Sequence, residues 1–135
     1  TAASSQPYCE LNGSSTNNAK DLLLKANTWY TLTCKRTSPY AIGANIYFLD
    51  PTTMQQTSIT YDVIYVDRGQ TTATKNNVYM YDAGIVYEEV KFKLPQDMYA
   101  QVQVRYKAGT NVTVSNDVQY PMLRLASDTD DTYQL

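Results

Sequence analysis

The clearest pattern of hydrophobic and polar positions lies in residues 90–106, VKFKLPQDMYAQVQVRY. In its second half every other residue suits a buried face, and this set is Met98, Ala100, Val102, Val104 and Tyr106. A period of two is typical of a β-strand with one buried and one exposed face. The first half alternates in the same way, with Val90, Phe92 and Leu94 as its apolar set. We therefore predict two strands joined at a corner, whose apolar faces need a second sheet to cover them.

Similar patterns recur along the chain and predict about eight strands in all. The further strand-like stretches are residues 28–36, 43–49, 58–67, 78–87, 111–115 and 118–125, and the one at 78–87 is interrupted at Ala83-Gly84. Turn signals separate the strands at spacings of roughly 8–14 residues, which is typical of antiparallel sandwiches and barrels. We predict that residues 1–135 form a single all-β domain, an antiparallel two-sheet sandwich.

The ends of the chain and one internal segment carry different signals. Residues 1–8 are small and polar and predict an extended N-terminal arm, and residues 127–135 form an acidic C-terminal tail. Residues 9–11 could begin a strand. Residues 19–26 are the only helix-friendly segment, but eight residues are few for a stable helix. A short helical turn and an edge strand are therefore both open for this segment.

The composition narrows the class of protein. Charged residues make up only 18% of the chain, and their place is taken by polar residues and 13 tyrosines, which suit a half-wet β surface. A net charge of −2 counts against a general nucleic-acid binder, because such proteins need a basic face. It also counts against a polybasic membrane anchor. No apolar run approaches the ~20 residues of a membrane-spanning helix.

Three features predict a protein that is secreted or displayed on the cell surface. The sequence begins at Thr1 rather than at Met, which suggests a processed end. Its two cysteines, Cys9 and Cys34, are an even number suited to one disulfide, which would tie the N-terminal arm to the strand at 28–36. Glycosylation sequons occur at Asn12 and Asn111.

Two stretches resemble the immunoglobulin-type sandwich. TWYTLTCKR, residues 28–36, resembles the second strand of that fold with its inward cysteine, and LPQDMYAQVQVRY, residues 94–106, resembles its corner and sixth strand. The resemblance implies an immunoglobulin-like arrangement of the sandwich. The usual partner cysteine would lie in the sixth strand, where this chain has Ala100, Val102 and Val104, so Cys9 is left as the partner of Cys34.

In composition and architecture the chain is also similar to subunits of archaeal and bacterial surface filaments, pilus-like or thread-like, that are built by donor-strand exchange. Those subunits are secreted, glycosylated sandwiches rich in Tyr, Thr and Asn, in which a tail completes the sheet of the next subunit. The resemblance implies a homo-polymer at the cell surface.

Residues suited to catalysis or metal binding are scarce. The chain has no histidine, which excludes Ser-His-Asp and Cys-His arrangements and histidine-ligated metals. Glu88 and Glu89 are neighbours in a strand and would point to opposite faces, unlike the paired carboxylates of a glycosidase. The tail residues Asp128, Asp130 and Asp131 lack the glycine and distal glutamate of a calcium loop. We predict that the protein is not an enzyme and has no catalytic residue, cofactor or metal.

Aromatic residues gather in the middle strands. Exposed aromatic rings on a flat sheet can stack on sugars, and Trp29, Tyr47, Tyr79 and Tyr81 are therefore a candidate binding face. The competing interpretation is that these tyrosines pack within the domain or between subunits, with their hydroxyl groups at the water.

The sequence favours a non-enzymatic extracellular structural or adhesive protein that assembles with itself into a surface filament by strand exchange. In this hypothesis, an N- or C-terminal segment pairs with an exposed sheet edge of the neighbouring copy. The alternative is an immunoglobulin-like binding module that uses the tyrosine-rich face to bind carbohydrate or a receptor on a cell surface. A small secreted or viral factor that engages a host protein is not separable from that alternative by sequence.

Overall fold

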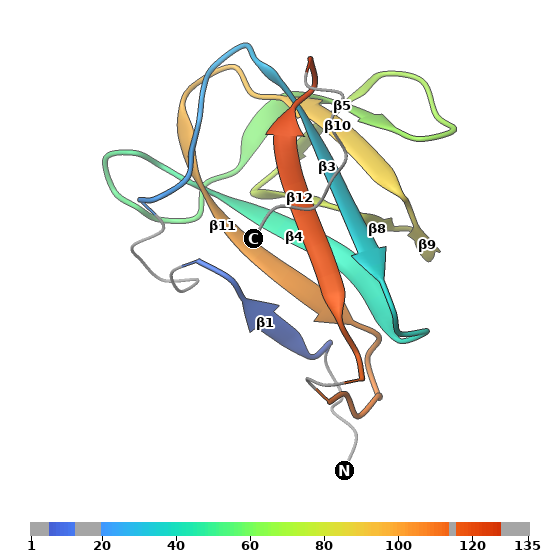
Figure 1. Cartoon of the computed structure of the whole chain (residues 1–135). Coiled ribbons are helices and arrows are strands. Elements are labelled where there is room, and N and C mark those ends of the chain that lie inside the picture. Colours follow the sequence, from blue (N-terminus) through green and yellow to red (C-terminus); the bar gives the residue numbers. More distant parts are fainter. Residues whose placement is uncertain (1–5, 13–19, 114–115, 128–135) are drawn as a thin grey trace.

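The computed structural model describes residues 6–12, 20–113 and 116–127, which form an all-β sandwich of two antiparallel sheets (Figure 1). In sheet A the strand order is β1-β11-β4-β7, and β2 also pairs with β11. Its strands are β1 (Tyr8–Glu10), β2 (Leu23–Leu24), β4 (Ala41–Leu49), β7 (Asn77–Tyr79) and β11 (Met98–Tyr106). The predicted fold class, an antiparallel two-sheet sandwich, is confirmed.

Sheet B has the order β12-β3-β10-β5-β6. Its strands are β3 (Trp29–Arg36), β5 (Ile59–Tyr65), β6 (Thr71–Lys75), β10 (Glu89–Lys93) and β12 (Gln119–Leu125). The strands β8 (Tyr81–Asp82) and β9 (Ile85–Val86) form a hairpin that is hydrogen-bonded as a separate two-stranded sheet. None of the described residues belongs to a helix with the length and apolar character needed to span a membrane.

The described residues form twelve strands rather than about eight. The segment at 19–26 supplies the edge strand β2, in which Leu24 is buried opposite Met98. Strand β6 lies in a stretch for which no strand was predicted, and it pairs with β5 along the sheet edge. Within the described residues of 111–115 the predicted strand does not form. Instead, a turn is closed there by hydrogen bonds from Asp117 N to Thr113 O (2.9 Å) and from Thr113 N to Asp117 Oδ2 (2.7 Å).

The core lies between the sheets and follows the predicted alternation. The apolar set of the first predicted strand is fully buried, as are Met98 and Ala100 of β11. Phe48 is the centre of the aromatic packing, with ring centroids 5.3 Å from Tyr61 and 6.2 Å from Phe92. The apolar face of residues 90–106 therefore supports the sandwich from both sheets, since β10 belongs to sheet B and β11 to sheet A.

The expected disulfide between Cys9 and Cys34 is absent, and this prediction was wrong. Cys9 lies in β1 of sheet A and is exposed, opposite Val104, whereas Cys34 is buried in β3 of sheet B, opposite Pro121. The two strands belong to different sheets and do not pair with each other. The Sγ atom of Cys34 instead lies 3.5 Å from Gln119 Oε1. The prediction rested on the even number of cysteines, and that number does not indicate in which sheet each cysteine lies.

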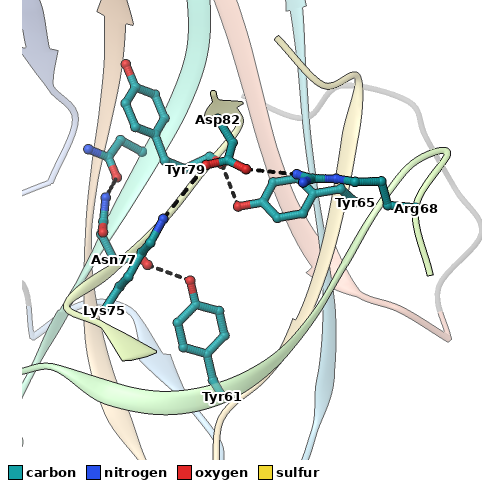
Figure 2. Close-up of polar contacts among 8 residues, drawn as sticks. Tyr61, Tyr65, Arg68, Lys75, Asn77, Tyr79 and Asp82 are labelled. Atoms are coloured by element: carbon teal, nitrogen blue, oxygen red, sulfur yellow. Dashed lines mark hydrogen bonds and ion pairs between the residues drawn. The ribbon is translucent and has the colours of Figure 1, made fainter. Parts of the chain in front are cut away.

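One long side of the sandwich is closed by tyrosine hydroxyl groups (Figure 2). From β5 in sheet B, Tyr61 donates to the backbone oxygen of Asn77 (2.6 Å) and Tyr65 donates to that of Tyr79 (3.3 Å), both in β7 of sheet A. Arg68 lies over the Tyr65 ring at 4.4 Å and forms an ion pair with Asp82 at 2.9 Å, which holds the β8–β9 hairpin against this side. The carbonyl groups at the free edge of β7 are thus partly satisfied from the opposite sheet.

Candidate interaction surface

On the other long side of the sandwich, the Gln119 side chain of β12 bridges the sheets at one end, donating to Arg105 O (2.8 Å) and accepting a hydrogen bond from Gly43 N (3.0 Å). The rest of this side is not closed by any residue that the structure describes. We call it the seam, the gap between β1 and β2 at the edge of sheet A and β12 at the edge of sheet B. Two cavities of about 310 and 220 Å³ lie along it, and Leu11 lines both. The larger is lined by apolar side chains of both sheets, including Leu32, Val102 and Leu123. The seam is therefore an apolar groove that reaches toward the core.

Three separate pieces complete the outer edge of β11 at the seam. Strand β1 pairs with Gln103, Val104 and Arg105, and β2 pairs with Met98 and Tyr99. Between these strands the side chain of Asn12 bridges the gap. The outer edge of β11 is thus hydrogen-bonded along its length, although its partners come from two separate strands and one side chain.

Asn12 takes the place of a backbone peptide group in this edge. Its Oδ1 accepts a hydrogen bond from Val102 N at 2.6 Å, and its Nδ2 donates to Ala100 O at 2.7 Å. The same Nδ2 also lies 3.2 Å from Asp21 Oδ1, so both of its hydrogens are directed at acceptors. Asn12, the asparagine of the first sequon, is therefore a half-buried structural residue. Asn111, the asparagine of the second sequon, is exposed and follows β11 in the chain.

The gap filled by Asn12 leaves apolar surface uncovered. Val102 is only partly buried, although Ala100 and Val104 on the same face of β11 are buried. Leu11 donates its N–H to Val102 O at 2.9 Å, yet its side chain remains 51% exposed. A strand side chain placed over this point would bury both.

Several exposed apolar residues belong to the strands that border the seam. Of the large apolar side chains exposed in the described part of the chain, five belong to β1, β2 or β12 or directly follow β1; they are Tyr8, Leu11, Leu23, Tyr120 and Leu125. The opposite edges differ, because β6 is a Thr-rich strand and β7 is engaged by the tyrosine hydroxyl groups.

The candidate tyrosine-rich face is only partly assembled. Tyr47 in β4 and Tyr79 in β7 both face outward from sheet A, and the Tyr79 and Tyr81 rings lie 5.9 Å apart. Trp29 lies on the other sheet, in β3, where the Lys93 ammonium is 5.2 Å from its ring. The structure therefore brings three of the four predicted residues together and separates the fourth.

Polar groups on that face bond mainly to one another. Arg105 Nη2 donates to Tyr47 OH (3.1 Å) and to Gln103 Oε1 (2.7 Å), and the Tyr79 hydroxyl donates to Gln6 Oε1 (2.9 Å). Burial raises the pKa of Tyr79 above its ordinary value. Gln101 and Gln103, expected on a wet face, are fully buried within this network. The sequence analysis did not predict this network. The alternation of glutamine and valine at residues 101–104 was the feature that could have indicated it.

The candidate carboxylates and metal ligands do not come together in one site. Glu88 pairs with Arg36 at 2.7 Å and Glu89 with Lys91 at 3.8 Å, both at exposed carboxylates. Among the described residues no three His, Cys, Asp or Glu side chains are grouped so that they could hold a metal ion. The aspartates at 128, 130 and 131 lie outside the described residues.

No protein-family model matches the chain, and comparisons with curated proteins and with solved structures likewise find no match. The seam, the tyrosine-rich face and the sheet edges are thus the features from which a function can be proposed.

Proposed function

We propose that this chain is a non-enzymatic structural or adhesive protein of the cell exterior, whose copies assemble into a filament through their seams. One observation carries the proposal: one side of the sandwich is closed by tyrosine hydroxyl groups, while the other, bridged at one end by Gln119, is a largely apolar groove with two cavities. A surface of this kind is suited to accept a β-segment, because backbone pairing gives affinity and side-chain pockets give specificity.

The exposed apolar residues supply the driving force. Fully burying a leucine that was in water contributes ~1.5–3 kcal/mol. Leu11 and Leu125 lie beside the seam and would gain from such burial. Because the seam lies on one side only, a segment of one copy that enters the seam of the next makes a head-to-tail contact. Contacts of that type generate rings or open filaments.

The decisive comparison uses two exposed apolar residues of nearly equal exposure. Leu11 (51% exposed) lies in the seam, and Ile85 (52% exposed) lies in the β8–β9 hairpin. We expect the unmodified chain and Ile85→Asp to form high-mass particles as concentration rises, and Leu11→Asp to remain monomeric in sedimentation velocity and electron microscopy. A monomeric unmodified chain at every concentration, or equal assembly of both variants, contradicts the proposal.

The alternative of a carbohydrate- or receptor-binding face has weaker support. Its four residues do not form one surface, since Trp29 lies on the opposite sheet from Tyr47. The polar groups beside Tyr47 and Tyr79 are already engaged with Arg105 and Gln6.

A further inference from the structure

We propose that the outer face of sheet A carries an anion-binding site, built around Arg105 of β11, that takes the carboxylate of an acidic sugar. The side chain of Arg105 lies on this face because Val104 and Tyr106, its neighbours in the strand, are buried in the core. The proposal goes beyond self-assembly through the seam and does not depend on it.

The charge of the half-buried Arg105 side chain is not neutralised by a neighbouring carboxylate. Arg68, which also lies over tyrosine rings, forms an ion pair with Asp82 at 2.9 Å. No ion pair joins Arg105 to a carboxylate in the part of the chain that the structure describes, and Glu10, on the same face of β1, lies opposite Gln103 instead. A half-buried cation of this kind attracts an anion more strongly than a fully exposed one, because less water screens it.

Hydrogen bonds hold the Arg105 guanidinium in a fixed position. Nε and Nη2 both donate to Gln103 Oε1, at 3.0 and 2.7 Å, and Nη2 also donates to Tyr47 OH at 3.1 Å. Gln103 is fully buried and donates in turn to Gln101 Oε1 at 3.3 Å. These bonds leave the two hydrogens of Nη1 without an acceptor among the described residues, and Nη1 is not a buried atom. A ligand therefore meets an arginine that is already ordered.

The Tyr47 hydroxyl supplies a second donor beside the guanidinium. Because a guanidinium has no acceptor, Tyr47 OH accepts the bond from Arg105, and its own hydrogen remains to be donated. No described residue accepts that hydrogen. The two oxygens of a carboxylate can therefore take one bond from Arg105 Nη1 and one from the Tyr47 hydroxyl, and charge-assisted bonds of this kind are stronger than neutral ones.

The aromatic rings around Arg105 favour an acidic sugar over an acidic peptide. The guanidinium carbon lies 4.9 Å from the ring centroid of Tyr8 and 6.0 Å from that of Tyr47. Tyr8 is 52% exposed, so it offers an apolar surface beside the charge. In an acidic sugar the carboxylate is joined directly to a rigid ring, which can pack on Tyr8. The carboxylate of a peptide side chain ends a flexible stem, and ordering that stem costs free energy.

Neutral sugars suit this face less well. The Tyr79 hydroxyl already donates to Gln6 Oε1 at 2.9 Å, and Trp29 lies on the other sheet. The donors that remain beside the Tyr8 ring are those of Arg105 Nη1 and the Tyr47 hydroxyl, which together fit an anion.

The test measures the binding of a galacturonic acid trimer to the full chain by isothermal titration calorimetry. Its methyl ester, in which each carboxylate is blocked, is the matched neutral ligand, and triglutamate is the acidic peptide. We expect the acid trimer to bind, and the other two to bind more weakly by about tenfold or more, as expected for the loss of a hydrogen bond to a charged group. Absence of binding, or equal binding of acid and ester, overturns the anion site. Equal binding of the peptide overturns the assignment to a sugar.

Variants of the chain locate the site. Arg105→Gln and Tyr47→Phe should each weaken binding of the acid trimer by about tenfold or more, because each removes one donor to the carboxylate. Arg68→Gln is the matched control, since it changes the net charge by the same amount as Arg105→Gln but removes an arginine that Asp82 already neutralises (Figure 2). Its affinity should be unchanged. Equal losses in the two arginine variants, or none in either, contradict the site.

Tyr47→Phe guards against an Arg105 variant that does not fold, because it keeps the aromatic ring and removes only the hydroxyl group. Urea unfolding shows whether each variant remains folded. A folded Tyr47→Phe chain that binds the acid trimer as tightly as the unmodified chain overturns the proposed site.

Discussion

At the scale of single residues, Asn12 shows how one side chain can replace a stretch of backbone. Its amide presents a donor and an acceptor in the order that a peptide group would, and it satisfies Ala100 O and Val102 N where no strand lies beside them. The asparagine of a glycosylation sequon therefore has a structural role here. Attaching a sugar replaces one Nδ2 hydrogen, so it would give up the bond to Ala100 or the one to Asp21.

Replacing Asn12 by alanine is expected to destabilise the fold by ~1–2 kcal/mol, because two backbone groups of β11 lose their partners at a half-buried edge. Urea unfolding gives the free energy directly. The control is Asn111→Ala, which changes the other sequon asparagine at an exposed position and should be close to neutral. Equal losses in the two variants would show that the Asn12 bridge contributes nothing.

The two cysteines should differ sharply in reactivity. Burial raises the pKa of the Cys34 thiol to about 12, so this group stays protonated and shielded near neutral pH, while Cys9 is exposed. Alkylation at pH 8 followed by mass spectrometry should modify Cys9 in the folded protein and Cys34 only after unfolding. Protection of Cys9 that is lost on reduction would instead reveal the disulfide that the structure lacks.

At the scale of elements, the strands that could be predicted are those with strict alternation. Residues 90–106 gave β10 and β11 with the correct buried face, whereas β6 was missed because a Thr-rich edge strand has no apolar face. The seam could not be predicted, since it depends on β12 joining sheet B while β1 stays on sheet A. Periodicity identifies the face of a strand that is buried, but not its neighbours.

The hydrogen bonds from the Tyr61 and Tyr65 hydroxyl groups to β7 should stabilise the fold. Tyr61→Phe removes the hydroxyl that donates to Asn77 O and should cost ~1–2 kcal/mol in the free energy of unfolding. Tyr40→Phe, at an exposed tyrosine, is the matched control and should be neutral. A loss of the same size in both variants would mean that the closure contributes no stability.

The same closure sets a dependence on alkaline pH. Burial raises the pKa of Tyr65 to about 12 and that of Tyr61 as well, above the ordinary value of ~10. A raised folded-state pKa gives stability that is complete below pH ~10 and is lost as the pH rises toward 12. The free energy of unfolding should therefore fall from pH 10 upward, and less steeply in Tyr61→Phe. A flat profile to pH 12 would contradict this assignment.

At the scale of the whole molecule, the core of the sandwich takes no buried apolar side chain from residues 6–12. Deleting residues 1–12 should leave a cooperatively unfolding β-protein, because the core begins at Leu24. Its circular dichroism should stay that of a β-sandwich, and its mass in solution should be that of a monomer, because it lacks Leu11 and the β1 border of the seam. An unfolded deletion variant would show that the segment is part of the core after all.

The tyrosine hydroxyl groups that bind β7 also give the molecule a direction. Because the seam lies on one side of the sandwich only, copies that join through it would form a chain with two unlike ends. Growth would then be polar, like that of a cytoskeletal filament.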